Sequence, residues 1–309
     1  MGYMFKILVV CLLFILPAAF QSGLQFKEED GRVSLYQDDQ LVFSYQTETV
    51  SKDGQYPRAN YVHPLNDFSG KPITEDFPED HLHHRGIFWT WHQLYLDGQS
   101  LSDPWICEGI SWDVHDLQYR VQGKKAALNA SVDWLVGADK QALIKEKVQM
   151  EYQNHSDYYQ LDFRITLQSQ RDHVELGGSD DNKGYGGFSA RLALGEDVAF
   201  SDATGIVTAD NEQVEAGNWL LVEDIGENQT QVAILYHPES TADLQGWILR
   251  ERNSMQNPVW PGRERAVLNE GEEVSIIASL VVFSDEVNKN QLEKIYKGFL
   301  GKKWLSVVN

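Results

Sequence analysis

Alternating apolar and polar residues dominate the middle of the chain. Between residues 159 and 168 every second side chain is apolar, which is the period of a strand with one buried face. Residues 148–152 alternate in the same way, and residues 154–157 would close a hairpin between the two segments. Residues 126–136 add a third long strand. The pattern predicts a meander of long antiparallel strands in one broad sheet.

Shorter apolar runs, bounded by turn residues, lie on both sides of this region. Residues 32–36 and 41–45 predict a hairpin, and residues 87–91 predict a buried strand. Residues 94–108 predict a loop, because glycine, aspartate and proline interrupt them. Residues 274–283 predict the last strand of the chain.

Only the C-terminal region has helical spacing. Leu292, Ile295, Tyr296 and Phe299 fall on one helical face, and Ser284 is the expected N-cap. The predicted fold class is therefore all-β: a large antiparallel β-sandwich with a short C-terminal α-helix. We expect residues 23–309 to form this sandwich as a single domain.

The first 22 residues have the pattern of a signal peptide. Lys6 precedes an apolar run from Ile7 to Phe20, and small residues around Ala18 suit a cleavage site. The run is shorter than the roughly 20 apolar residues of a spanning helix. We therefore expect a signal peptide over residues 1–22, a secreted or periplasmic mature protein, and no membrane association after cleavage.

Composition narrows the classes of partner. The chain has 26 basic and 46 acidic residues, a formal net charge of −20 and 42% hydrophobic residues. Nucleic-acid binding depends on an excess of basic groups, so this charge excludes nucleic acid as an expected partner. Removing the predicted signal peptide leaves Cys107 as the one cysteine. Packing, and not an intrachain disulfide, is therefore expected to hold the fold.

Groups able to move a proton concentrate in residues 63–91. This stretch holds four of the nine histidines, and Pro64, Pro72 and Pro78 constrain its first part as a loop. The apolar residues 87–91 follow directly. A titratable loop held by a rigid buried strand is a common arrangement of binding and catalytic sites.

The side chains from Asp80 to Arg85 indicate proton-transfer chemistry. If it is extended, His81, His83 and Arg85 face one side and His84 faces the other. Imidazoles titrate near neutral pH and could act as general acid and base, with Arg85 binding an anion and Asp80 orienting a ring. The predicted catalytic residues are Asp80, His81, His83, His84 and Arg85.

Two other interpretations of these histidines are open at the level of sequence. His81 and His83, with Asp80 or His63 as a third ligand, could bind a divalent metal such as zinc. The histidines could instead brace the loop through hydrogen bonds to buried carbonyl groups.

Seven further residues are candidates for substrate binding: His63, Trp89, Trp91, His92, Glu108, Arg191 and His237. The tryptophans could stack on sugar rings or fill the core. Arg191 could bind an anionic group or pair with a carboxylate. The glycine-rich residues 177–187 are expected to be flexible, and they lack the strand and helix that flank a phosphate-binding loop.

Four short motifs occur in a characteristic order. They are HPL from His63, DHLHHRG over residues 80–86, GFSAR from Gly187, and YHP over residues 236–238. In this order they resemble the DUF6807 family, whose members are often labelled "methane oxygenase PmoA". The resemblance implies a secreted bacterial protein, commonly encoded beside carbohydrate-degrading enzymes and sugar dehydrogenases. The label does not fit this chain, because a methane oxygenase subunit is an integral membrane protein and the one apolar segment here is at the signal position.

The histidine motif and the chain length also resemble the galactose mutarotase superfamily. That resemblance implies a β-supersandwich with paired histidines and a carboxylate over a sugar ring. We therefore expect a secreted carbohydrate-active enzyme that abstracts a proton from a sugar or keto-sugar, as a lyase, an epimerase or an eliminative glycoside-cleaving enzyme. A non-catalytic carbohydrate-binding protein and a metal-dependent glycan hydrolase are the alternatives. The expected partner is a small-molecule or oligosaccharide substrate.

Overall fold

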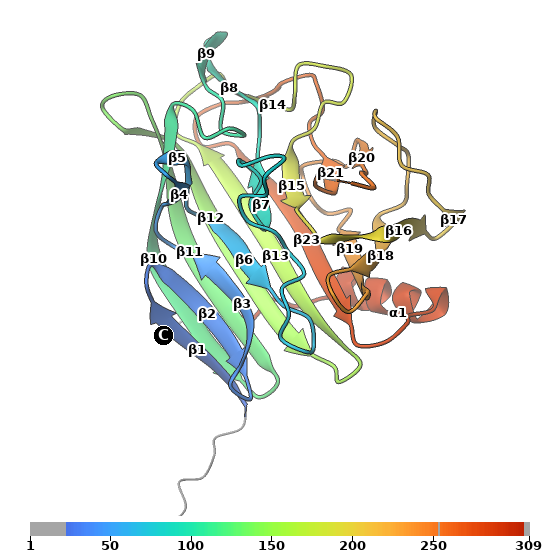
Figure 1. Ribbon diagram of the computed structural model, residues 1–309. Helices are drawn as coiled ribbons and strands as arrows, with labels where there is room; N and C mark the ends of the chain where they lie inside the picture. Colours follow the sequence, from blue (N-terminus) through green and yellow to red (C-terminus); the bar gives the residue numbers. More distant parts are fainter. Residues whose placement is uncertain (1–22, 253, 306–309) are drawn as a thin grey trace, which may run out of the picture.

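The computed structural model describes residues 23–252 and 254–305 (Figure 1). The predicted signal peptide lies outside these residues. Within them the chain forms antiparallel sheets and one helix. No helix in the described ranges is long and apolar enough to cross a membrane.

Six strands form the first large sheet. In spatial order they are β1 (Leu24–Glu29), β2 (Arg32–Gln37), β3 (Gln40–Gln46), β6 (Tyr61–Leu65), β7 (Ile87–Thr90) and β15 (Gly187–Ala190). Asp38 and Asp39 join β2 to β3 with φ angles of 51° and 66°, the left-handed conformation of a tight hairpin turn. The predicted hairpin and the predicted strand after the histidines are both confirmed.

Nine strands form the second large sheet. In spatial order they are β10 (Ile110–Gln122), β11 (Lys125–Val136), β12 (Gln141–Asn154), β13 (Tyr158–Ser169), β23 (Glu273–Phe283), β19 (Thr230–Tyr236), β18 (Trp219–Ile225), β16 (Leu194–Asp202) and β17 (Gly205–Ile206). Strands β10 to β13 are consecutive neighbours, and β12 pairs with β13 without a shift of register. The predicted meander is therefore confirmed.

Three small sheets complete the strand structure. They consist of β22 (Ala266–Leu268), β14 (Val174–Gly177), β8 (Gln93–Leu96) and β9 (Gln99–Ser102); β20 (Gly246–Ile248) and β21 (Asn257–Val259); and β4 (Val50–Lys52) and β5 (Gln55–Arg58). The prediction of a loop over residues 94–108 is wrong for its first half, where β8 and β9 form a hairpin. Leu94 is fully buried and pairs with Leu176 of β14, so contacts distant in sequence stabilise this hairpin.

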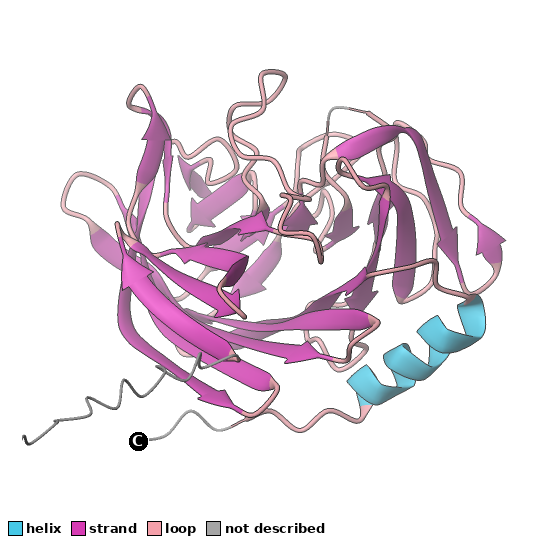
Figure 2. Ribbon diagram, turned by 60° about the horizontal axis from the view of Figure 1, so that its bottom comes forward, coloured by secondary structure: helices cyan, strands magenta, loops and turns pink. Residues whose placement is uncertain are grey.

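The two large sheets face each other and enclose the main core. In Figure 1 the blue strands β1 to β3 lie over the green strands β10 to β13, and Figure 2 shows both layers curving around the interior. Leu161, Phe163 and Ile165 of β13 point into this core, whereas the alternate residues Gln160 and Asp162 lie on the other face. The period of two in the sequence thus corresponds to an inner and an outer face.

The helix α1 (Lys289–Leu300) packs against the outer face of the nine-stranded sheet. Leu292, Ile295 and Phe299 meet a second apolar cluster formed by β18, β19 and β23. The predicted helix is confirmed, but the predicted N-cap is wrong. Asn288 caps the helix by accepting a hydrogen bond from the Gln291 N–H, while Ser284 donates to the Asp157 carbonyl before the helix begins.

One carboxylate lies inside the main core. Glu146 of β12 is 1% exposed and accepts hydrogen bonds from Trp89 Nε1 at 2.5 Å and Trp134 Nε1 at 2.6 Å. Asn60 Nδ2 donates to both carboxylate oxygens, at 3.1 and 3.0 Å. Burial raises the pKa of Glu146 to about 7, although these hydrogen bonds act in the opposite direction.

Candidate active site

The three adjacent histidines lie on the loop that connects β6 to β7. Residues 78–84 make consecutive turns: the His81 N–H donates to the Pro78 carbonyl, and the His84 N–H donates to the His81 carbonyl. The expectation of an extended segment with alternating faces is therefore wrong. Because a turn brings residues three apart together, His81 and His84 stack with ring centroids 4.6 Å apart and an interplanar angle of 5°.

His83 completes a compact group of three rings. It lies edge-on to both neighbours, with centroid distances of 5.6 Å to His81 and 4.7 Å to His84. His84 is buried and also contacts Trp105 and Phe88. His81 and His83 are partly exposed, and 43% of the His81 side chain is accessible. His81 and His83 can therefore be reached by a ligand, and His84 supports them from below.

A carboxylate orients His81. Asp80 Oδ2 lies 2.6 Å from His81 Nδ1, and Arg191 binds Asp80 through two N–H groups at 2.8 and 2.9 Å. Burial alone would raise the pKa of Asp80, but hydrogen bonds from Arg191 and His81 lower it to about 2. An ionised carboxylate can only accept, so His81 Nδ1 carries the proton and Nε2 is directed away from Asp80.

Arg191 is held inside the protein and shares its donors among three side chains. Besides Asp80, its Nε donates to Glu75 at 2.6 Å and its Nη1 lies 3.3 Å from His84 Nδ1. Arginine has no acceptor, so His84 Nδ1 accepts this bond and its proton lies on Nε2. Of the two roles open for Arg191, the structure shows pairing with carboxylates, and these bonds position His81 and His84.

Burial keeps two of the imidazoles neutral. Burial, together with the smaller effects of the nearby His81, His92 and Arg58, lowers the pKa of His83 to about 4. It also lowers the pKa of His84 well below 6.5, again with help from neighbouring cationic groups. At neutral pH both side chains therefore present one N–H donor and one acceptor nitrogen.

This shift predicts a pH dependence of stability. Between about pH 4 and 6.5 the unfolded chain binds a proton at His83 that the folded chain does not, so stability should rise with pH across this window and fall on acidification. His83→Gln should make this slope shallower, as measured by guanidinium unfolding at several pH values. His173→Gln, which replaces an exposed histidine, is the control. Equal slopes for the His83 variant and the unaltered protein would contradict the assignment.

A second carboxylate and imidazole pair lies beside the first. His92 Nδ1 is 2.9 Å from Asp103 Oδ2, and Asp103 also accepts from the backbone N–H groups of Trp105 and Ile106. The His92 ring stacks on Trp105, with centroids 5.2 Å apart. His92 Nε2 and Trp105 Nε1 are buried and have no hydrogen-bond partner among the described residues. These two unpaired groups increase the capacity of this region to bind a polar ligand.

Tyr185, which was not among the residues predicted from the sequence, contacts the second carboxylate and imidazole pair. Its ring lies 5.0 Å from His92 and 4.9 Å from Trp105. The glycine-rich residues 177–187 that carry it form a tight turn, because Ser179 and Tyr185 pair through their backbones and Asp181 accepts from two backbone N–H groups. A Cβ on Gly178 would lie 2.1 Å from the Gly184 carbonyl oxygen. Close backbone packing, and not flexibility, therefore explains these glycines.

Arg85 cannot bind a substrate anion in this structure. It is fully buried, and its N–H groups donate to Asp76, to the carbonyls of Val50 and Tyr56, and to the Tyr61 hydroxyl. Its guanidinium group also lies 3.6 Å from the centre of the Phe77 ring. These contacts use the donors that the predicted role required, so Arg85 fastens the loop to β4, β5 and β6.

Three of the remaining predicted residues lie away from the histidine group. Trp89 and Trp91 are core residues, whose indole N–H groups donate to Glu146 and to the Trp260 carbonyl. His237 lies under α1 against Phe299 and belongs to the second apolar cluster. Side chains alternate across a strand, and a sequence alone does not assign each one to the correct layer.

Two other predicted residues, His63 on β6 and Glu108 on the loop that carries Trp105, lie next to the loops of the candidate site. His63 is mostly buried and shares a 3.0 Å hydrogen bond with the Thr74 hydroxyl, and burial lowers its pKa. Glu108 is exposed, and its backbone pairs with Asp103 to close the loop that carries Trp105. Glu108 thus lies on the same loop as Trp105, but its side chain makes no hydrogen bond within the described residues.

The histidines are not arranged as metal ligands. In the described part of the chain, no group of three or more His, Cys, Asp and Glu side chains is placed to hold a metal ion. The rings of His81 and His83 lie edge-on with centroids 5.6 Å apart, His63 is hydrogen-bonded to Thr74, and Asp80 is already bound by Arg191 and His81. Metal ligands instead direct lone pairs at one point. The side chains therefore do not fit the metal site considered from the sequence.

The structure thus brings three imidazoles, Asp80 and Arg191 together on the loops of an antiparallel β-sandwich. A family model described as "Family of unknown function (DUF6807)" matches residues 32–297. The chain belongs to this family, as the order of the four motifs predicted. The motifs, from His63 to Pro238, all lie within the matched residues. No curated protein matches the chain.

Several solved structures are similar to this chain. One is a galactose mutarotase related enzyme from Lactobacillus acidophilus, with 11% identity over 86% of this chain and 99% of that chain and a TM-score of 0.37. Another is a putative aldose 1-epimerase from Escherichia coli K12, with 7% identity, coverage of 84% and 98%, and a TM-score of 0.37. A TPR-domain containing protein from Parabacteroides distasonis has 10% identity and a TM-score of 0.45, and the match covers 83% of this chain and 48% of that chain.

Proposed function

We propose that this protein is a secreted carbohydrate-active enzyme that removes a proton from a carbon atom of a sugar or keto-sugar. The observation that carries the proposal is the 2.6 Å contact between Asp80 and His81, beside a second imidazole that is neutral. A carboxylate that fixes the tautomer of one imidazole is a recurring arrangement for a general base. The neutral His83 provides an N–H donor at the same place.

The two imidazoles have different roles in the proposed step. His81 Nε2 takes the proton from a carbon next to a carbonyl group, and the electrons of the C–H bond form the double bond of an enolate. His83 donates a hydrogen bond to the enolate oxygen, a role that suits a neutral imidazole. A proton delivered from solvent to the other face gives an epimer, and His81 then releases its proton to solvent. Loss of a substituent from the next carbon, as an anion that takes the proton from His81 or from solvent, gives an elimination product.

The surroundings support a sugar as the substrate. Tyr56 and Tyr185 lie at the edges of the imidazole group, Tyr56 with its ring 5.8 Å from His83. Aromatic faces and a few placed polar groups are typical of small-molecule sites. Asp80, Arg191 and His84 hold the reacting imidazoles and do not contact the substrate.

Proton exchange in heavy water tests the proposal. Candidate uronic acids and 3-keto sugars are incubated with the protein, and NMR follows replacement of a carbon-bound proton by deuterium. His81→Gln should slow this exchange by about 10²-fold or more, while ligand-induced thermal stabilisation is retained. His173→Gln is the control and should exchange at the unaltered rate.

Three outcomes separate the proposal from its alternatives. Unchanged exchange in His81→Gln would refute the assigned base. Sugar binding without exchange in the unaltered protein would instead identify a non-catalytic carbohydrate-binding protein. Absence of both binding and exchange would refute the sugar substrate.

A further inference from the structure

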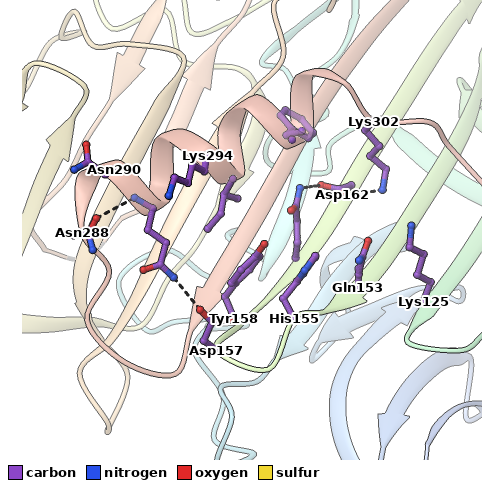
Figure 3. Close-up of a pocket in the computed structure, with 15 residues that line it drawn as sticks. Lys125, Gln153, His155, Asp157, Tyr158, Asp162, Asn288, Asn290, Lys294 and Lys302 are labelled. Atoms are coloured by element: carbon purple, nitrogen blue, oxygen red, sulfur yellow. Dashed lines mark hydrogen bonds and ion pairs between the residues drawn. The ribbon is translucent and has the colours of Figure 1, made fainter.

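A second candidate site lies on the opposite face of the nine-stranded sheet. A hollow of about 870 Å³ opens between α1 and the outer face of β12 and β13, as Figure 3 shows. We call it the helix groove, and it is lined by Lys125, Gln153, His155, Tyr158, Asn290 and Lys294, among other residues. It shares no residue with the histidine group. Its volume is in the range of small-ligand sites.

The floor of the helix groove contains an aromatic platform. His155 and Tyr158 stack with ring centroids 4.4 Å apart and an interplanar angle of 10°, and both are half-buried. The hairpin turn between β12 and β13 holds them, since His155 N–H donates to the Tyr158 carbonyl and Ser156 N–H donates to the Asn154 side chain. Burial lowers the pKa of His155, so its ring is neutral at neutral pH. A flat, neutral platform of this kind suits the apolar face of a sugar ring.

Polar side chains around the platform are free to bind a ligand. Gln153 and Asn290 line the groove, and their amides make no hydrogen bond with a described residue. Amide groups donate and accept at once, which suits hydroxyl groups. By contrast, Gln291 on the same helix already donates to Asp157 at 3.0 Å.

Two cations of the groove also lack an acidic partner within the described ranges. Lys125 and Lys294 form no ion pair there, whereas Lys302 is bound by Glu151 and Asp162 at 2.6 Å each. Three lysines and two aspartates line the groove, so the formal charges of the groove sum to a small positive value, although the net charge of the whole chain is −20. Lys125 and Lys294 favour a ligand that carries negative charge.

We propose that the helix groove binds an acidic oligosaccharide. One sugar ring stacks on Tyr158, the amides of Gln153 and Asn290 bind hydroxyl groups, and Lys125 and Lys294 bind carboxylates. The groove acts as a non-catalytic subsite, and this inference does not depend on the chemistry of the histidine group.

Calorimetric titration with two matched probes tests this inference. Tetragalacturonate carries carboxylates, and maltotetraose is a neutral oligosaccharide with the same number of sugar units. Tetragalacturonate should bind, with an affinity that falls as ionic strength rises, and maltotetraose should bind more weakly. The double variant Lys125→Gln, Lys294→Gln should lower the affinity for tetragalacturonate by about tenfold.

A matched control and a second variant make the result specific. Lys145 and Lys147 are exposed on the same strand as Gln153 but line a different hollow, so Lys145→Gln, Lys147→Gln should bind as the unaltered protein does. Tyr158→Leu should weaken binding of both probes, since it removes the ring. Equal affinity of the groove and control double variants, or no binding of tetragalacturonate, would overturn the inference. His81→Gln should bind tetragalacturonate as the unaltered protein does. The titration therefore tests the helix groove alone, and the proton-exchange experiment tests the proposed catalytic function.

Discussion

Glu146→Leu should destabilise the folded protein by about 3–5 kcal/mol, because it leaves several buried hydrogen-bond donors without an acceptor. Leucine has a similar size but no acceptor, so the indole N–H groups of Trp89 and Trp134 and the amide of Asn60 would be left unpaired in the core. Tyr45 fixes the orientation of Asn60 through a 2.7 Å hydrogen bond, which prevents the amide from turning to another partner. Chemical denaturation measures the loss of stability.

The control for this prediction is an exposed glutamate on the other sheet. Glu29→Leu on β1 should change stability by no more than about 0.5 kcal/mol, because Glu29 is exposed at the surface. Glu146→Gln should lie between the two variants, since its amide keeps one acceptor oxygen but turns an NH₂ group toward the indole donors. A Glu146→Leu protein as stable as the control would show that the three donors find other partners or water.

Arg85→Met should also cost about 3–5 kcal/mol of stability, because it removes one partner of a buried ion pair. Asp76 loses the Nε donor at 2.5 Å, and the carbonyls of Val50 and Tyr56 lose their donors. Arg85→Lys should recover little of the loss, since an ammonium group cannot reproduce the planar contacts with Phe77 and several acceptors at once. Chemical denaturation again provides the measurement.

This prediction separates a structural arginine from one that binds substrate. Arg263→Met, which replaces a half-exposed arginine paired with Asp180, is the control and should change stability by less than about 1 kcal/mol. If Arg85→Met instead folded with unaltered stability but lost affinity for an anionic sugar, the role predicted from the sequence would be correct and the structural role wrong.

The clustering of the candidate residues was predictable, but its geometry was not. The concentration of histidines after Pro78 drew attention to one loop, and four of the predicted residues, Asp80, His81, His83 and His84, lie together there. The predicted alternation failed because hydrogen bonds between Pro78, His81 and His84 make turns, and turn geometry depends on contacts made by the whole loop. Gly86 shows such a contact: a Cβ there would lie 2.1 Å from the Val62 carbonyl oxygen of β6.

The contribution of residues from distant segments was the hardest feature of the candidate site to predict from the sequence. Trp105 contacts His84 from a loop about 20 residues away, and Tyr185 contacts Trp105 and His92 from a loop about 100 residues away from His84. Neither loop has a motif that indicates a shared site. A tyrosine isolated among glycines was the one available signal for Tyr185. Conversely, Trp89 and Trp91 lie close to the histidines in sequence but point into the core.

The sequence by itself determined the all-β class, the meander of long strands, the C-terminal helix and the loop that carries the histidines. These features follow from local periodicity and from residue types that are close together in the chain. Only the tertiary structure decided that Arg85 is enclosed, that Arg191 holds Asp80, and that His83 has a pKa of about 4. The physical reason is that burial and the pairing of charges depend on which segments meet in space, and the order of residues does not state these contacts.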